Sequence, residues 1–393
     1  MTTRLPQLAE THDCTGCMAC VASCKVSALK IVMGEDGHAY PRLDVDLCVN
    51  CLHCENVCKT SRTYVGNNEL KLSTPYAVWA NDEQLRSNST SGEFSAAVNR
   101  WFTNQFGGGI SVFFDGRKAK HIHIKNSEEI NRVQGSKYVW SDASEAYKQI
   151  AKVLPNNKVL FTGTGCQVAG VLAFFAKHPN RENLYTIDLI CGGVPSDLLM
   201  QSYMDNNPKV EAITSFRTKR QYELKGIVAG KEVTLPIGAL PIAGFKAEQT
   251  NRYVCYDCPF AKAHRCSDIT IGDLWGTASP TEERSKGVSL VVVHSAKGQE
   301  MLVNADVTAE RLNWRDILNE NKRLVYGHTP KIWLRRKLAV NYQKMNSARF
   351  ARIYSLMSSP SDPFGFSARV LNYLLKKIDK VHCRRVIKKV LHG

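Results

Sequence analysis

Long hydrophobic runs are absent from this sequence. The best candidates, at 168–176 and 288–293, fall well short of the ~18 to 20 apolar residues that a helix needs to cross a bilayer. The first ten residues, MTTRLPQLAE, hold no apolar segment behind their arginine and so do not resemble a secretory signal. These absences predict a cytoplasmic protein, with a position on a membrane surface as the other option.

Acidic residues are scarce at the end of the chain. Residues 331–393 hold 15 Lys and Arg against 2 Asp and Glu, whereas residues 1–60 hold 5 basic and 7 acidic side chains. The net charge of +16 is therefore mainly a property of the tail, and it does not make the whole protein a nucleic-acid binder. A hydrophobic content of 44% excludes wholesale disorder.

The sequence also lacks a G-x-G-x-x-G run behind a predicted strand, so a Rossmann NAD site is not indicated. Cysteine, in contrast, is abundant, with fourteen in the chain. Because the cytosol keeps thiols reduced, a disulfide framework is not expected. Ligation of a metal or a cluster is therefore the expected role of these residues.

Eight of the cysteines form an internal duplication near the start of the chain. A C-x-x-C-x-x-C-x-x-x-C run at 14–24 recurs at 48–58. This spacing is that of bacterial ferredoxins with two [4Fe–4S] clusters, in which the fourth cysteine of each run ligates the other cluster. The predicted ligands are Cys14, Cys17, Cys20 and Cys58 for one cluster, and Cys48, Cys51, Cys54 and Cys24 for the other.

A pair of structural zinc sites is the alternative interpretation of the two runs. Zinc is held by four ligands, typically two C-x-x-C pairs separated by a longer loop, and the runs fit that spacing poorly. The proline that usually follows the fourth cysteine in ferredoxins is absent, and Lys25 and Lys59 stand in its place. A lysine beside a net-negative cluster raises the reduction potential of that cluster and leaves ligation intact.

Beyond the cysteine-rich head, short apolar segments alternate with helical patterns. Four segments have the composition of buried strands, at 159–161, 184–190, 269–274 and 288–294. The last of them is expected to be a parallel strand buried on both faces. The alternation predicts an α/β core with a mixed, largely parallel sheet and flanking helices. The expected domains are a small α+β ferredoxin domain at 1–65, the two parts of the core at 66–155 and 156–328, and a basic helical tail at 329–393.

Five further cysteines lie in the core, within a series of motifs. These motifs are GSKYV at 135–139, GTGCQVAG at 163–170, DLICGGVPS at 188–196, CYDC at 255–258 and DITIGDLWG at 268–276. In this order they resemble the coenzyme F420 hydrogenase/dehydrogenase beta-subunit family, over roughly residues 75–325. A ferredoxin head is a common attachment in that family. The resemblance implies a flavoprotein that holds FAD beside a further [4Fe–4S] cluster.

The core cysteines are expected to ligate this third cluster. Cys166 opens a predicted helix behind a glycine turn, where N–H groups and the helix dipole favour a thiolate. Buried apolar thiols at 166 and 191, and structural zinc at 255 and 258, are the other interpretations. The sequence departs from the family at Gly165, a usual proline, and at Gly192, a usual histidine. The expected ligands are Cys166, Cys191, Cys255 and Cys258, with Cys266 as an alternative to either of the first two.

Two turns rich in glycine and hydroxyl groups, SNSTSG at 87–92 and GSKY at 135–138, are the candidate contacts for FAD. Anions bind well to main-chain N–H groups in such turns and at helix starts, although either turn also suits an ordinary helix cap. Lys137 is expected to pair with the pyrophosphate or to stabilise a reduced flavin. The predicted cofactor-binding residues are Ser89, Thr90, Ser91, Gly92, Gly135, Ser136, Lys137, Tyr138, Gly163 and Thr164.

Asp273 ends a predicted core strand, on the side of an open α/β sheet where ligands usually bind. With Lys137 it is the predicted catalytic residue, orienting the flavin or a substrate. Trp275 is interpreted as a packing residue. His121 and His123 alternate with isoleucines on a predicted strand, and we interpret them as a solvated strand face rather than as metal ligands.

The basic tail ends in an amphipathic pattern at 368–391, with apolar residues at helical spacing and lysines and arginines on the remaining face. Such a helix suits an anionic membrane surface, a solvated face of a helix docked on the core, or an acidic protein partner. Nucleic-acid binding is not expected, because no recognised nucleic-acid-binding fold accompanies the charge. Cys383 lies in this segment and is interpreted as a free thiol.

Together these features predict an iron–sulfur flavoprotein oxidoreductase. Clusters carry single electrons, and a flavin exchanges both single electrons and hydride. The resemblance implies electron transfer between ferredoxin-type clusters and FAD, and to or from a two-electron substrate such as coenzyme F420 or another small organic molecule. Family members with this architecture also occur in surface-polysaccharide loci. The alternative is a non-catalytic electron-transfer subunit that feeds a separate partner enzyme.

Overall fold

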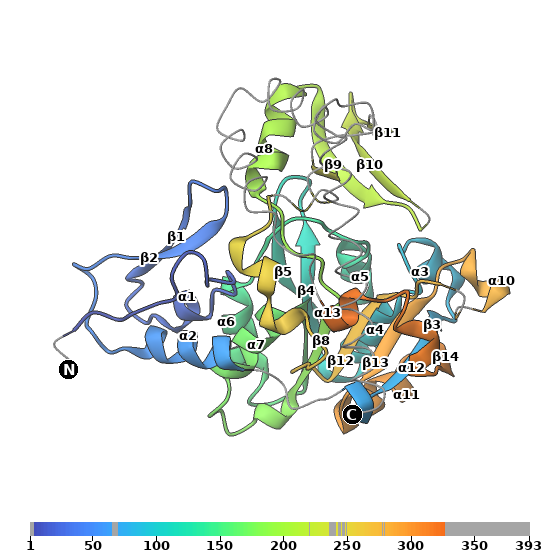
Figure 1. Ribbon diagram of the computed structural model, residues 1–393, viewed down its shortest axis with the longest axis horizontal. Coiled ribbons are helices and arrows are strands. Elements are labelled where there is room, and N and C mark those ends of the chain that lie inside the picture. The colour runs from blue at the N-terminus through green and yellow to red at the C-terminus, as the bar shows by residue number, and fades with distance from the viewer. Residues whose placement is uncertain are drawn as a thin grey trace.

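The computed structural model describes residues 4–64, 70–219, 221–235, 241–242, 245, 248, 250–276, 278 and 280–326. Within them the chain forms a small head, a central sheet covered by helices, and a smaller unit drawn at the top of Figure 1. Among these residues, no helix has the length and apolar character required to cross a bilayer. The helix expected at 368–391, the tail as a whole and Cys383 lie outside the described residues.

The head is a short α+β unit built around the two cysteine runs. Its elements are α1 (Ala19–Ser23), β1 (Leu29–Met33), β2 (Ala39–Leu43) and α2 (His53–Thr63). Strands β1 and β2 pair as an antiparallel hairpin. Each helix starts from a residue in the left-handed conformation, Met18 or Leu52, which directly follows the second cysteine of its run. The two halves of the duplication therefore share a backbone as well as a spacing.

A nine-stranded mixed sheet forms the centre of the described chain, in the order β14-β3-β13-β12-β8-β7-β4-β5-β6. The pairs β12–β8, β8–β7, β7–β4 and β5–β6 are parallel, and the other pairs are antiparallel. The predicted mixed α/β core is thus confirmed, with most of its parallel pairs at the centre. The strands are β3 (Thr74–Ala80), β4 (Gly109–Phe114), β5 (Ala119–Ile124), β6 (Ser141–Asp142), β7 (Val159–Thr164), β8 (Leu184–Leu189), β12 (Ile269–Asp273), β13 (Ser289–Val293) and β14 (Val307–Arg311).

Strand β13 corrects one expectation. It is buried along its whole length, as its run of valines predicted, but it pairs antiparallel with both β12 and β3. The prediction of a parallel strand was wrong because burial on both faces depends on the layers above and below the sheet, not on strand direction. Val291 faces one apolar core, and Leu290 and Val292 face another.

Helices cover both faces of the sheet because its strands alternate apolar side chains between two cores. Leu160 of β7 lies in one core, and Val159 and Phe161 lie in the other. The first face carries α4 (Phe94–Phe106), α5 (Ser127–Val133) and α11 (Ala296–Asn304). The second carries α6 (Ser144–Val153) and α7 (Gly165–Phe174), and the head packs on the outside of this pair (Figure 1).

Short helical elements complete the core. They are η1 (Leu70–Leu72), α3 (Glu83–Ser87), η2 (Arg181–Asn183), η3 (Tyr253–Asp257), η4 (Pro259–Ala261), α10 (Thr281–Arg284), α12 (Trp314–Ile317) and α13 (Arg323–Tyr326). Of these, α12 and α13 supply Ile317, Leu324 and Val325 to the core that faces Leu290. They therefore close the second face of the sheet beyond α7.

A smaller unit is inserted between β8 and β12. It consists of α8 (Asp197–Asn206), β9 (Val210–Arg217), β10 (Tyr222–Val228) and β11 (Lys231–Thr234), with an antiparallel sheet in the order β11-β10-β9 and an apolar core of its own. No pattern in the sequence indicates this unit. The expected boundaries after 65, 155 and 328 stay predictions, and the central sheet runs across the second of them, since β4 pairs with β7.

Candidate functional site

Four head cysteines lie together on the side of the head that faces the core. Cys14 and Cys20 are buried, and burial raises the pKa of their thiols. The like charges of Cys17, Cys58 and Cys14 raise the pKa of Cys20 further, so all four groups are neighbours. The hydroxyl of Tyr147 on α6 donates to the Cys17 carbonyl oxygen at 2.9 Å. We call Cys14, Cys17, Cys20 and Cys58 the first head set.

The other head cysteines range from buried Cys54 to exposed Cys51. Burial raises the pKa of Cys54 to about 11, and the thiols of Cys24 and Cys51 contribute to that rise. Cys24 is thus a neighbour of the second run, as a ligand exchanged between the two runs has to be. Cys51 is exposed and Cys48 is partly exposed. We call Cys24, Cys48, Cys51 and Cys54 the second head set.

A third group of thiols gathers in the core from separate places in the sequence. Cys166 opens α7, Cys191 follows β8, and Cys255 and Cys258 belong to the turn around η3. All four line one small cavity. Burial raises the pKa of Cys255 and Cys258 to about 12, and each of them also senses the Cys191 thiol. We call these four the core set.

Cys266 lies outside the core set. Burial raises the pKa of its thiol to about 12, and the charged groups that act on this thiol are Asp188, Arg265 and Asp268. Cys266 does not line the small cavity that the core set lines. Its Sγ lies 3.9 Å from the Gly165 carbonyl oxygen, and the side chain packs against the apolar core beneath α7. The geometry therefore favours Cys191 and Cys166 over Cys266 as partners of the C-x-x-C pair.

The donor chemistry of the three sets fits iron–sulfur clusters. Thiolates are the ligands of such clusters, and buried thiols lose their protons when a positive metal centre compensates the charge. Within the described residues, no group of three or more His, Cys, Asp or Glu side chains is arranged to hold a single metal ion. The residues that would hold the clusters are the ones predicted from the cysteine spacing in the head and from the motifs in the core, and their ligation stays a prediction.

A cavity of about 620 Å³ opens at the carboxyl ends of β7, β8 and β12, under the inserted unit. Its volume lies within the range of pockets that hold organic ligands and cofactors. Most of the predicted FAD contacts line it, together with Asp273. The lining residues among them are Thr90, Ser91, Gly135, Ser136, Lys137, Tyr138, Gly163 and Thr164.

Two predicted contacts do not reach the cavity. The Ser89 hydroxyl is buried and donates to the Ser91 carbonyl oxygen at 2.5 Å, so it shapes the turn. Gly92 packs against the neighbouring strands, where an added Cβ would lie 2.2 Å from the Val78 carbonyl oxygen. Both residues support the 87–92 turn from behind, and the side chain of Thr90 bonds across the cavity wall to that of Ser136 at 2.9 Å.

Lys137 is held inside the wall by its own turn. Its Nζ donates to the carbonyl oxygens of Val133 and Gln134 at 2.6 and 2.7 Å, which are free acceptors at the end of α5. Burial lowers the pKa of Lys137 to about 8, and Glu93 opposes that shift. Burial also raises the pKa of Glu93, which lines the same cavity. A partly buried lysine and a partly buried glutamate therefore face the cavity together.

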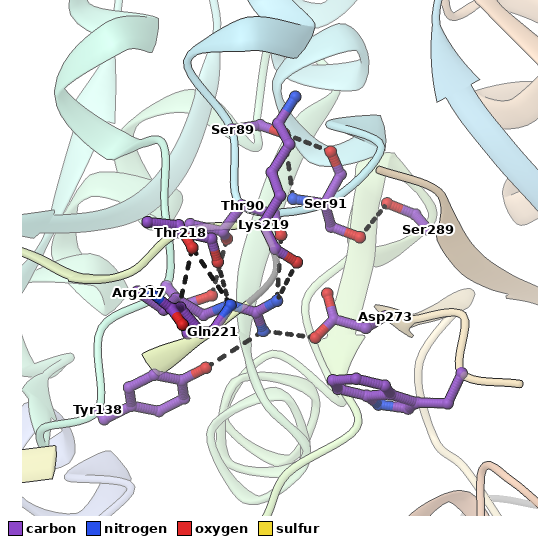
Figure 2. A network of polar contacts seen from close by, with 12 residues as sticks. Ser89, Thr90, Ser91, Tyr138, Arg217, Thr218, Lys219, Gln221, Asp273 and Ser289 are labelled. Atoms are coloured by element: carbon purple, nitrogen blue, oxygen red, sulfur yellow. Dashed lines mark hydrogen bonds and ion pairs between the residues drawn. The ribbon is translucent and has the colours of Figure 1, made fainter. Parts of the chain in front are cut away.

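Arg217 is the centre of a polar network at the cavity wall (Figure 2). It lies at the end of β9 and is 7% exposed. Its guanidinium donates to the Asp273 carboxylate at 2.5 Å, to the Tyr138 hydroxyl at 3.4 Å and to the Thr90 carbonyl oxygen at 3.2 Å. Both predicted turns and the end of β12 are thus tied to one cation. Burial, despite this cation, raises the pKa of Tyr138 to about 12.

Two interpretations of single residues were wrong. Trp275 is 51% exposed and lines the cavity, so it is not a packing residue. His121 is 3% exposed, stacks on Phe161 with ring centroids 5.0 Å apart, and shares a hydrogen bond with the Thr162 carbonyl oxygen at 3.2 Å. Burial lowers its pKa to about 4. His121 lies on the face of β5 that α6 covers. The alternation of His and Ile does not show which face of the strand a helix covers.

The position of Gly192, where the related family has histidine, is filled from elsewhere. A Cβ at Gly192 would lie 1.6 Å from Nη1 of Arg323, so the guanidinium of α13 occupies the place of a side chain at 192. Arg323 also lines the cavity. The chain therefore has no histidine at 192, and a cation from another element, Arg323 of α13, reaches the cavity there.

Sequence reasoning missed several residues of this site. Glu93, Arg217, Tyr222 and Arg323 line the cavity and belong to no recognised motif. The one hint in the sequence is that Glu93 stands directly before an amphipathic segment. In the structure Glu93 starts α4 with a left-handed φ of 62° and without a side-chain cap. Arg217 and Tyr222 come from the inserted unit, and no local pattern connects that unit to the cavity.

Two family models match the chain. Residues 13–61 match the 4Fe-4S dicluster domain, and residues 156–319 match the model of the C terminus of the beta subunit in coenzyme F420 hydrogenase/dehydrogenase. The class of the molecule is therefore that of iron–sulfur electron-transfer proteins. More particularly, the chain carries a region that matches the C-terminal part of the beta subunit of coenzyme F420 hydrogenase/dehydrogenase, behind a dicluster head, in agreement with the resemblance of its sequence motifs.

Comparison with curated proteins gave no significant match. Among solved structures, the fold is similar to a chain of the F420-reducing [NiFe] hydrogenase complex from Methanosarcina barkeri, in a xenon-derivatised form. The two chains share 17% sequence identity, and the match covers 73% of this chain and 92% of that chain with a TM-score of 0.45.

Proposed function

We propose that this protein is an iron–sulfur flavoprotein with three [4Fe–4S] clusters, held by the two head sets and the core set, and with FAD in the 620 Å³ cavity. One observation carries the proposal. The large cavity and the small thiol cavity share a wall made of Thr164, Cys191, Gly193 and Val194. A ligand in one cavity is therefore separated from a group held by the core set by single side chains.

The division of chemistry follows from the groups that the residues can hold. Bound clusters supply one-electron transfer, and a bound flavin supplies exchange between one-electron and two-electron partners. The turn at 135–138, and Thr90 and Ser91 of the 87–92 turn, line the cavity with hydroxyls suited to phosphate, whereas the main-chain N–H groups of Ser91 and Gly92 already donate to the hydroxyls of Ser89 and Ser289. Lys137 adds a cation, and Arg217 fixes the relative position of the two turns and Asp273.

A two-electron substrate would approach from the rim of the cavity. Trp275 is half exposed there, and Glu320, Lys322 and Arg323 from the last described segment line the same space. An aromatic surface with cations beside it suits a flat, anionic organic molecule. Coenzyme F420 is one such molecule, and another small hydride donor or acceptor, including one in a surface-polysaccharide pathway, is the other candidate.

The second candidate function is that of an electron-transfer subunit that feeds a separate redox enzyme. The observation that favours it is the exposed side of the head. Cys51 is exposed, and Val45, Leu47 and Val49 beside it are 55%, 49% and 43% exposed. Apolar surface of this kind, next to a ligand of the second head set, suits transient contact with a redox protein. Contact with an anionic membrane through the tail remains a proposal from composition alone.

Anaerobic purification followed by iron, sulfide and flavin analysis tests the proposal. We expect about twelve iron atoms per chain, four for each cluster, together with one FAD. Eight iron atoms would contradict the core cluster, and the absence of flavin would contradict the cofactor. Bleaching of the flavin by reduced coenzyme F420 alone would favour the enzyme, and bleaching only in the presence of a second protein would favour the subunit.

A further inference from the structure

One side chain at the junction of head and core is charged and completely buried. Arg252 is 0% exposed and precedes the turn that carries Cys255. Its guanidinium packs flat against the head loop between Cys14 and Cys17, where a Cβ added to Gly16 would lie 2.8 Å from Cζ. The space is available because Gly16 has no side chain and adopts a φ of +72°. A core residue thus lies directly against a loop of the first head set.

Arg252 has more hydrogen-bond donors than it has acceptors around it. Nη2 donates to the Ala39 carbonyl oxygen at 2.9 Å, and the guanidinium lies 4.7 Å from the Tyr40 ring. Nε and Nη1 have no hydrogen-bond partner among the described residues. Arg265, the other fully buried arginine, is instead paired with Asp188 at 3.2 Å. A buried cation without a carboxylate partner is unfavourable unless another negative group compensates it.

Two groups of thiols lie near this cation. The guanidinium lies against Gly16, between Cys14 and Cys17, and Arg252 directly precedes η3, where the Cys255 N–H donates to the Arg252 carbonyl oxygen at 3.0 Å. Cys14 belongs to the first head set and Cys255 to the core set. Thr15 of the head and Val254 beside Cys255 line the same small cavity as the core thiols. The guanidinium is therefore shared by the two sets.

The positive charge of Arg252 also acts on one carboxyl group. Asp197, at the start of α8, is partly buried; desolvation raises its pKa to about 6, and the positive charge of Arg252 opposes that rise. It forms no ion pair with Arg252 among the described residues, so it is a distant and partial counter-charge. Four thiolates around an iron–sulfur cube give that cluster a net negative charge, and reduction adds one more electron. Such clusters supply the negative charge that the Arg252 guanidinium lacks.

We infer that Arg252 is the shared counter-charge of the first head cluster and the core cluster, and that it raises the reduction potentials of both. This inference rests on the proposed function, because it needs iron–sulfur clusters in both sets. A fixed positive charge stabilises the reduced, more negative form of a cluster more than its oxidised form. The second head cluster lies on the exposed side of the head and is outside this effect. Arg252 is thus a positioning and tuning residue, not a catalytic one.

Potentiometric titration of the anaerobically purified full chain, followed by electron paramagnetic resonance, tests the inference. In Arg252→Met we expect two of three clusters to become at least tenfold harder to reduce, which is about 59 mV for one electron. The third cluster should titrate as in the wild type. Arg252→Lys, which keeps the charge, should shift the same two clusters less than threefold. Unchanged potentials in Arg252→Met would overturn the inference, and so would an equal shift in Arg252→Lys.

Asp197→Asn supplies an independent arm that keeps the buried arginine in place. It removes the carboxylate that partly offsets Arg252, so the same two clusters should become easier to reduce. A shift confined to the second head cluster, or no shift, would contradict the inference, even if Arg252→Met fails to load with iron. The proposed function has a separate readout, which is the iron content of the wild type. Eight iron atoms per chain would contradict the core cluster, whatever potentials these variants show.

Discussion

The head and the core hold cysteines in two different ways. In the head, the duplicated runs at 14–24 and 48–58 place three thiols of each set within a few residues, and only the fourth crosses to the other run. In the core, the four thiols come from the start of α7, the end of β8 and the turn at η3. The first arrangement is local, whereas the second exists only when the central sheet has formed.

The difference shows what each region can be used for. A local set needs little more than its own loops, so the head resembles a separate module that packs against α6 and α7. The core set stands where parallel strands end, and a large cavity opens at the same place. Open α/β sheets bind ligands at this edge. In the proposed function, coupling between the thiols and a cofactor therefore belongs to the core, and the head extends it toward the surface.

The largest expected effect is a loss of iron, and it distinguishes the core set from Cys266. Cys258→Ser should lower the iron content from about twelve to about eight atoms per chain, because one of three clusters loses a ligand. Cys266→Ser is the matched control, since Cys266 is equally buried but faces Asp188 and Arg265. It should keep about twelve. Iron analysis of anaerobic preparations measures both effects, and a loss of four iron atoms in Cys266→Ser as well would show that Cys266 is a ligand in place of Cys166 or Cys191.

The next effect concerns the cation that joins the cavity walls. Arg217→Gln should weaken FAD binding at least tenfold, about 1.4 kcal/mol, because the two turns and Asp273 lose their common partner. Fluorescence titration of FAD released from the protein measures this affinity.

Arg86→Gln is the control for Arg217→Gln. Arg86 is also 7% exposed and paired, with Glu283, but it does not line the cavity. It should lose thermal stability while it keeps its FAD. If both variants release FAD to the same degree, general destabilisation rather than the network explains the result.

A smaller effect should appear in the pH dependence of cofactor binding. Burial lowers the pKa of Lys137 to about 8, and a bound phosphate would raise it, so binding takes up a proton above that pH. FAD affinity should therefore fall as the pH rises beyond about 8, by at most tenfold per pH unit. Lys137→Met should show weaker binding with a flatter profile, whereas a wild-type slope in the variant would exclude Lys137 as the titrating group.

The smallest predicted effect compares the two head sets. Cys51 is exposed and Cys20 is buried, so air should destroy the second head cluster several-fold faster than the first. Spectra recorded during exposure to oxygen should show a fast phase that is missing in Cys51→Ser. Loss of all clusters at one rate would mean that solvent exposure does not distinguish the sets.

Much of the fold and part of the site could be predicted from the sequence. The duplicated spacing indicates the head, and the strand-rich segments with motifs indicate a mixed core, because both signals are local. The burial of β13 and of His121 depends on which layers cover the sheet, and the direction of β13 is set by its antiparallel pairing with β12 and β3. Arg217 and Arg252 acquire their roles from segments far away in the chain, and no spacing encodes such contacts.

Anomalous diffraction at the iron absorption edge, from crystals grown without oxygen, tests the central claim most directly. We predict three separate iron-cluster peaks: two in the head, and one between Cys166, Cys191, Cys255 and Cys258 beside the large cavity. Peaks in the head alone, or a single-atom peak at the core thiols, would contradict the account.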